Sequence, residues 1–131
     1  MNINKLQETI DNTMYWDMEV LDVSIDYFGD EVNIVIADEN ETCWTIKFLS
    51  CCKVAYETDA NRRRIRNVKD MKKSQLGYYA QDITIDNVRQ DDVLEINLDL
   101  SIMDLKIECK DILVERHLVD EFNFFWNDNI N

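Results

Sequence analysis

The sequence predicts a mainly β fold of the α+β class: an antiparallel meander or sandwich of about seven strands, with an N-terminal helix and a short C-terminal helical segment. Apolar and polar residues alternate over most of the chain, which is typical of strands that bury one face. Short turn-forming segments separate these runs, without the helical crossovers that join parallel strands. The chain has 2 glycines and no proline, which excludes a glycine-rich phosphate-binding loop.

Helical spacing is confined to the two ends of the chain. Near the N-terminus it predicts one amphipathic helix, capped by Asn2 or Asn4, with an apolar stripe made of Ile3, Leu6, Ile10 and Met14. Near the C-terminus an aromatic group has helical spacing, and we expect it to pack onto the sheet: Phe122, Phe125 and Trp126.

The first half of the chain alternates as a meander of strands. From Glu19 to Phe28, carboxylate and hydroxyl side chains occupy one face, and the other face carries Leu21, Val23, Ile25 and Tyr27. Gly29 and Asp30 form a turn, so this run and the next predict a hairpin. The later strands of this half are expected at 32–36, 44–48 and 54–56. A turn at 38–41 is expected between the strands at 32–36 and 44–48.

The second half predicts further strands after a polar stretch that ends near Gly77. They are expected at 79–85, 94–100 and 105–114. In the last of these the apolar positions change from odd to even numbers, which predicts a β-bulge near Lys110 and Asp111 inside one continuous strand.

Length and composition predict a single cytoplasmic domain over residues 1–131. The chain is 46% hydrophobic, enough for one core, and it has neither a membrane-spanning apolar run nor a visible signal peptide. Its 4 cysteines, Cys43, Cys51, Cys52 and Cys109, lack the paired spacing of zinc ligands, and we expect reduced thiols and no metal or cofactor.

The sequence contains no catalytic constellation, so we expect a protein that is not an enzyme and assign no catalytic residue. The single histidine, His117, has no nucleophile in a suitable context beside it. Carboxylate pairs are frequent, but no apolar cleft is predicted to raise the pKa of one of them. The alternative is a small β-domain with a metal-dependent hydrolase activity or a general role in protein interaction.

Charge is the strongest compositional feature, with 27 acidic against 14 basic residues and a net charge of -13. Such a field repels nucleic acid and anionic membranes and attracts basic proteins. The outward positions of two predicted strands, with one turn, supply the acids that we expect to bind a partner: Asp22, Asp26, Asp30, Glu31, Glu95 and Asp99. If these strands are neighbours, the carboxylates form one patch; the oligomeric state stays open.

One basic segment, residues 62–73, interrupts the acidity. It holds seven of the 14 basic residues and a single acid, Asp70, so it carries +6 and the remaining chain -19. We expect a solvated loop or hairpin tip that pairs with the protein's own acids. The alternatives are a contact with an acidic part of the partner, or a nucleic-acid site, although the interleaved aromatics of such sites are absent.

Several strand sequences resemble small acidic immunity proteins of Gram-positive bacterial Rhs-type, or polymorphic, toxin systems. The resemblance lies in residues 16–20, 23–27 and 44–48, and in a later run at 107–112. It implies an immunity protein that binds and neutralises a cognate toxin domain encoded beside it. With the acidity of the chain, it leads us to expect a basic nuclease as the toxin.

Overall fold

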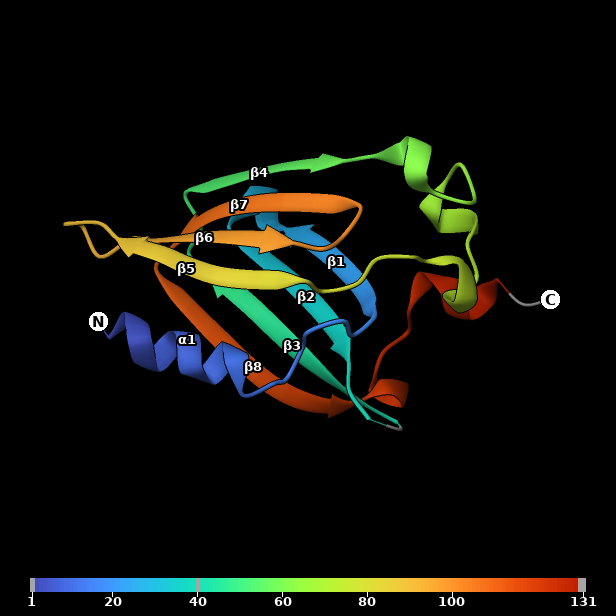
Figure 1. Cartoon of the computed structure of the whole chain (residues 1–131), viewed down its shortest axis with the longest axis horizontal. Coiled ribbons are helices and arrows are strands. Elements are labelled where there is room, and N and C mark those ends of the chain that lie inside the picture. The colour runs from blue at the N-terminus through green and yellow to red at the C-terminus, as the bar shows by residue number, and fades with distance from the viewer. Residues whose placement is uncertain (1, 40, 130–131) are drawn as a thin grey trace.

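Two four-stranded antiparallel sheets face one another in the computed structural model, which describes residues 2–39 and 41–129 (Figure 1). The first sheet has the order β1-β2-β3-β8, with β1 at Val20–Asp26, β2 at Glu31–Ala37, β3 at Thr42–Leu49 and β8 at Asp111–Leu118. The second has the order β4-β7-β6-β5, with β4 at Lys53–Thr58, β5 at Asp82–Val88, β6 at Leu94–Asp99 and β7 at Met103–Cys109. The predicted antiparallel, mainly β fold is confirmed, with eight strands in the described chain.

The core lies between the sheets and is made of alternate residues of each strand. In the first sheet Ile34 of β2 pairs with Ile46 of β3, and both are fully buried. In the second sheet Ile96 of β6 pairs with Ile107 of β7 in the same way. Burial of each such side chain contributes about 1.5–3 kcal/mol, so the alternating pattern selects which face of each strand turns inward.

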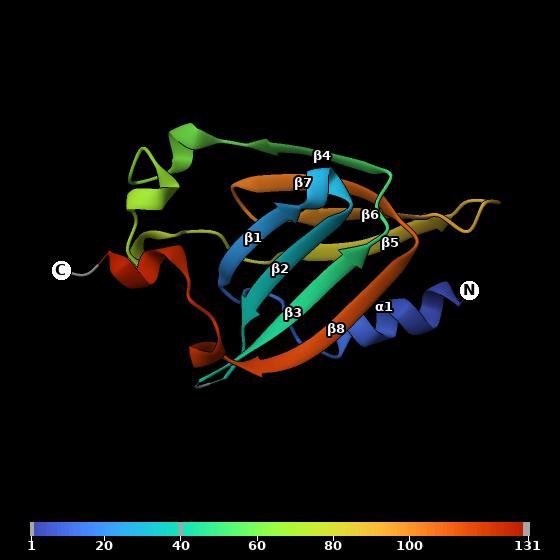
Figure 2. The ribbon, with the colours of Figure 1, turned by 180° about the vertical axis from the view of Figure 1, so that it is seen from behind.

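The N-terminal helix, α1 (Ile3–Asp11), covers one open side of the sandwich, where β5 and β8 are the edge strands (Figures 1 and 2). The side chain of Asn2 accepts a hydrogen bond from the Lys5 N–H at 3.2 Å, which confirms Asn2 as the cap. Met14 does not belong to the apolar stripe. It lies beyond the helix with a positive φ of 55° and is mostly exposed.

Side chains from this N-terminal region also cap the free edge of β5. Gln7 donates to the carbonyl of Ile83 at 2.8 Å and accepts from the N–H of Ile85 at 2.8 Å. The Tyr15 hydroxyl accepts from the N–H of Ile83 at 2.9 Å. Because a free strand edge is a template for pairing with another chain, these bonds close β5 to strand addition.

The chain passes twice between the sheets, and both crossings correct the predicted topology. The meander holds for β1, β2 and β3, but β4 leaves that sheet and pairs with β7. The predicted continuous strand with a bulge near Lys110 and Asp111 is wrong, because β7 ends at Cys109 and β8 starts at Asp111 in the other sheet. The inner faces of the two sheets point toward one another, so a chain that changes sheet here must also change which residues turn inward.

An irregularity in β1 changes the predicted faces of that strand. The register with β2 shifts between Val20 and Asp22, so Leu21 leaves the inner face and joins a second apolar cluster. Tyr27 does not continue the strand either. It belongs to a 3-10 turn over Tyr27–Gly29 and is largely exposed. The hairpin between β1 and β2 is confirmed; the predicted turn at 38–41 includes Asn40, which lies outside the described residues.

A second apolar cluster joins the C-terminal segment to the basic segment and to the outer side of the first sheet. The aromatic residues pack there as expected, but Phe125 and Trp126 lie in a 3-10 turn and Phe122 lies in extended backbone. The indole N–H of Trp126 donates to the carbonyl of Leu21 at 2.9 Å. The buried members of the cluster are Leu21, Val35, Cys43, Met71, Leu76, Phe124 and Trp126. No helix among the described residues is both long and apolar enough to cross a membrane.

We predict that Tyr15→Phe lowers the free energy of unfolding by about 1–3 kcal/mol, because the buried N–H of Ile83 loses its acceptor. Tyr79→Phe is the matched control, because the Tyr79 side chain is 42% exposed. Removal of its hydroxyl group should change the free energy of unfolding by less than about 0.5 kcal/mol. Urea unfolding at equilibrium measures both, and equal stabilities of the two variants would contradict the role of the Tyr15 hydroxyl.

Candidate partner-binding surfaces

The six acidic residues predicted to bind a partner do not form one patch. Asp22 and Asp26 lie on β1 in the first sheet, whereas Glu95 and Asp99 lie on β6 in the second. All four side chains are on outer faces, and the outer faces of the two sheets point in opposite directions. The condition for a single patch, that these strands are neighbours, is therefore not met.

The first acidic surface lies on the outer side of the β1–β2 hairpin. Asp26 pairs directly with Glu31, and Asp30 lies in the turn that joins the strands. The Asp26 carboxylate accepts hydrogen bonds from Ser24 at 3.0 Å and from the Asn33 amide at 2.8 Å. These bonds hold the carboxylate in one orientation, so the surface presents a fixed negative charge.

Asp22 is the electrostatically costly member of this surface. Burial raises the pKa of its carboxyl group, and the negative charge of Asp26 raises it further, while a hydrogen bond from the main chain of Val23 opposes both. Strand β1 therefore holds a carboxylate where its charged form is disfavoured.

The second acidic surface is a row of four carboxylates that crosses all four strands of the second sheet. Asp99 of β6 pairs with Asp82 of β5 and with Asp104 of β7. Asp104 in turn pairs with Glu57 of β4. All four side chains are exposed, and none forms an ion pair within the described part of the chain. We call these residues, Asp82, Asp99, Asp104 and Glu57, the carboxylate row.

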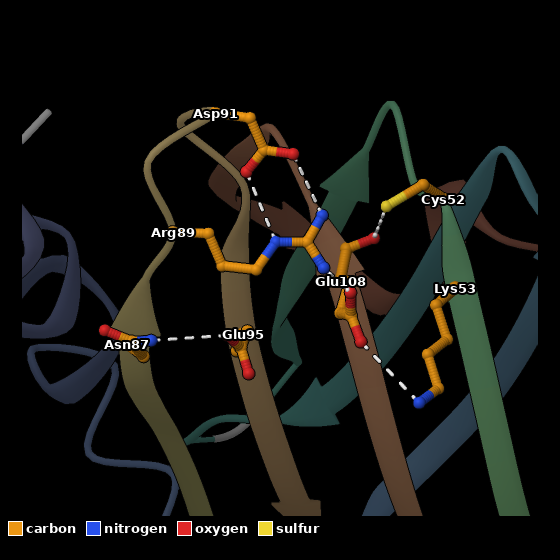
Figure 3. A network of polar contacts seen from close by, with 7 residues as sticks. All are labelled: Cys52, Lys53, Asn87, Arg89, Asp91, Glu95 and Glu108. Carbon is orange, nitrogen blue, oxygen red and sulfur yellow. Dashed lines mark hydrogen bonds and ion pairs between the residues drawn. The ribbon is translucent and has the colours of Figure 1, made fainter.

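A parallel row on the same face includes a carboxylate that is paired with bases, Glu108, which sets it apart from the carboxylate row. Glu108 of β7 forms ion pairs with Arg89 and, at 3.6 Å, with Lys53 of β4 (Figure 3). Arg89 also binds Asp91 at 3.1 Å. Of the carboxylate row, only Asp99 is predicted from the sequence as a partner-binding residue. The other three become its neighbours through strand register, which the sequence does not reveal.

The basic segment is a loop between β4 and β5 with most of its basic side chains exposed, as expected, but apolar residues anchor it. Met71 is fully buried in the second apolar cluster, with Ile65 and Val68 packed against it. Of its seven basic side chains, only Lys73 forms an ion pair with a described acid, Glu19, at 3.1 Å. The expected pairing with the protein's own acids is therefore limited to this one ion pair among the described residues.

A groove runs along the open side of the sandwich opposite α1, between the edge strands β1 and β4. It consists of two adjoining hollows of about 330 and 440 Å³, and Ile25 and Tyr56 line both. Val23 and Met103 add apolar surface to the first hollow, whose polar contributors include Asp22. The sequence reasoning missed this groove, because two strands far apart in the chain form its walls.

The histidine and the cysteines, considered above as catalytic or metal-binding groups, make contacts that stabilise the fold. The Nδ1 atom of His117 lies 3.0 Å from a Glu121 carboxylate oxygen, and the ring packs edge-on against Phe122. The four cysteines are free thiols, and burial raises the pKa of Cys51 to about 11 and that of Cys109 to about 12. Among the described residues no group of three or more His, Cys, Asp or Glu side chains is arranged to hold a metal ion.

Comparison with known proteins gives a family and a fold neighbour. Residues 2–116 match the family described as immunity protein PIM7. A crystal structure of an uncharacterized protein from Neisseria gonorrhoeae has a similar fold, with a TM-score of 0.52 and 16% identity over 77% of this chain and 92% of that one. No curated protein matches. Because the family match spans most of the sequence and all of β1 to β7, the chain belongs to the immunity protein PIM7 family.

Proposed function

We propose that the protein is an immunity protein that binds a cognate toxin domain and blocks its activity without catalysing a reaction. Membership of the immunity protein PIM7 family carries this proposal. The absence of a metal-binding cluster among the described residues is compatible with inhibition by occlusion. Tight binding that covers a toxin's active surface needs complementarity of shape and charge, and no chemistry in the inhibitor.

We further propose that the toxin is basic, and that it is a nuclease acting in the cytoplasm, where the immunity protein would meet it. A nuclease needs a positively charged surface to bind the phosphate backbone of its substrate. A protein with a net charge of -13 opposes nucleic acid but attracts such a surface. The two charge patterns together make a basic toxin domain the partner of best electrostatic fit.

The carboxylate row supports this choice of partner. Like charges directly opposite one another on neighbouring strands destabilise a sheet by a few tenths of a kcal/mol up to about 1 kcal/mol. The adjacent Glu108 shows that this face carries basic neighbours in other positions. A row without such compensation is explained if basic residues of a partner neutralise it in the complex.

We predict that the protein rescues cells that express the toxin domain encoded beside its gene. Co-expression should restore colony formation by several orders of magnitude relative to the toxin domain alone. With purified components, an equimolar amount should abolish cleavage of DNA or RNA. Stable binding without loss of nucleolytic activity would contradict inhibition of a nuclease, and a lack of both binding and rescue would contradict the immunity function.

We predict that the acidic surfaces accelerate association. Replacing Asp22 and Asp26 together by Asn, or Asp99 and Asp104 together by Asn, should slow binding to the toxin domain by about 2- to 10-fold at low salt and weaken its salt dependence. Asp120→Asn with Asp128→Asn is the control, because it removes the same charge from exposed sites outside both surfaces. Stopped-flow measurements give the association rates. If a double variant associates as fast as the control, the surface that it changes does not accelerate association.

We predict that Asp22→Asn stabilises the free protein at pH 7. The pKa of Asp22 is higher in the folded protein than its ordinary value of 3.8, so ionisation favours the unfolded chain as the pH rises through the range above 3.8. The amide cannot ionise, and the stability gain should disappear below the ordinary value. Urea unfolding between pH 3 and pH 7 tests this; a gain that is independent of pH would contradict it.

A further inference from the structure

The two open sides of the sandwich differ in how they are closed. On the side of β5 and β8, α1 covers the gap, and Gln7 and Tyr15 occupy the main-chain groups of β5. On the opposite side, between β1 and β4, lies the groove described above, where the described residues place no α-helix and where Arg63, Val68, Leu76 and Phe125 border one hollow (Figures 1 and 2). The fold thus blocks one edge and leaves the other accessible.

Strand β4 is the accessible edge. Within the described chain its main-chain groups bond only to β7, and every residue of β4 except Val54 is exposed. Each antiparallel edge strand directs alternate N–H and C=O groups away from its neighbour, ready to pair with an added strand. Strand β1 is less suitable, because it bulges near Leu21 and its start is bridged through Glu19 to Tyr79.

The groove next to this edge exposes apolar side chains that a partner could bury. Tyr56 of β4 is 55% exposed and Ile25 of β1 is 39% exposed, on opposite walls. Phe28 lines the second hollow and is fully exposed; it and its neighbour Tyr27, which is 71% exposed, lie on a backbone with φ of 58° and 54°. Exposed aromatic residues on strained backbone are costly in a free protein and are typical of binding sites.

The outer face of β4 indicates which charge a partner strand should carry beside Glu57. Glu57 ends the carboxylate row, so a strand added beside β4 would extend this row and place a side chain next to Glu57. On the opposite face of the same added strand, side chains would enter the groove beside Tyr56. Lys53, on the same outer face, is already paired with Glu108. An added strand with a basic residue beside Glu57 and apolar residues inward would therefore match both faces of β4.

We propose that an extended segment of the toxin domain, with alternating basic and apolar residues, adds to the second sheet beside β4. One of its apolar side chains fills the groove between Ile25 and Tyr56, and a basic side chain neutralises the end of the carboxylate row at Glu57. This proposal rests on the proposed immunity function and specifies the surface and the chemistry of the partner. A second copy of the chain is a poorer occupant, because each copy carries a net charge of -13.

Calorimetry with the purified toxin domain tests the side chains that the proposal names. Tyr56→Lys and Ile25→Lys should each weaken binding by about 30-fold or more, as expected for anchors at the centre of an interface. Leu113→Lys is the matched control, because Leu113 is 42% exposed on the outer face of the other sheet. Glu57→Lys should also weaken binding, whereas Glu8→Lys on α1 makes the same charge change on the blocked side and should not.

Amide hydrogen exchange gives a second readout that needs no substitution. The outward amides of residues 53–58 should exchange quickly in the free protein and become protected in the complex, while the edge of β5 should be unchanged. If the wild type binds but Tyr56→Lys and Ile25→Lys match Leu113→Lys, or if β4 gains no protection, this surface is wrong and the immunity function stands. If the wild type does not bind, both proposals fail. A free protein that is a dimer, and that Tyr56→Lys converts to a monomer, would assign the edge to a second copy instead.

Discussion

Burial of the two inner sheet faces against one another is the interaction on which the rest of the molecule depends. Residues such as Ile34, Ile46, Ile96 and Ile107 lose nearly all contact with water only because a second sheet covers the first. This requirement decides which side of every strand turns outward. The outer faces and the open sides of the sandwich are therefore the surfaces left for function.

The sandwich treats its two open sides differently, and this asymmetry has a physical basis. A sheet edge exposes main-chain donors and acceptors that can pair with another chain. The protein satisfies those of β5 with Gln7 and Tyr15, side chains that the N-terminal region brings to this edge. It leaves the main-chain groups of β4 that point away from β7 without a partner among the described residues, next to an apolar groove. An accessible edge is a liability in a protein that binds nothing and an asset in one that binds tightly.

The distribution of charge, like the accessible strand edge, leaves groups among the described residues uncompensated in the free protein. The six acids predicted to bind a partner are divided between two opposite outer faces, and the carboxylate row brings together four carboxylates that form no ion pair among the described residues. The basic segment does not serve as their counterpart, because apolar side chains such as Met71 hold it against the C-terminal aromatics. The molecule therefore keeps its negative potential available to a partner, at a cost in its own stability.

The sequence by itself determined the fold class, most of the strands, the N-terminal helix and the acidity, because each depends on local periodicity, propensity or composition. It did not determine which strands share a sheet, since alternation reports that a residue turns inward but not which sheet it faces. The phase change after Cys109 is a change of sheet, and Asp82, Asp104 and Glu57 join Asp99 only through register. The resemblance to immunity proteins is confirmed by the family match, but only the tertiary structure divided the predicted acidic site between two faces and left the edge of β4 accessible.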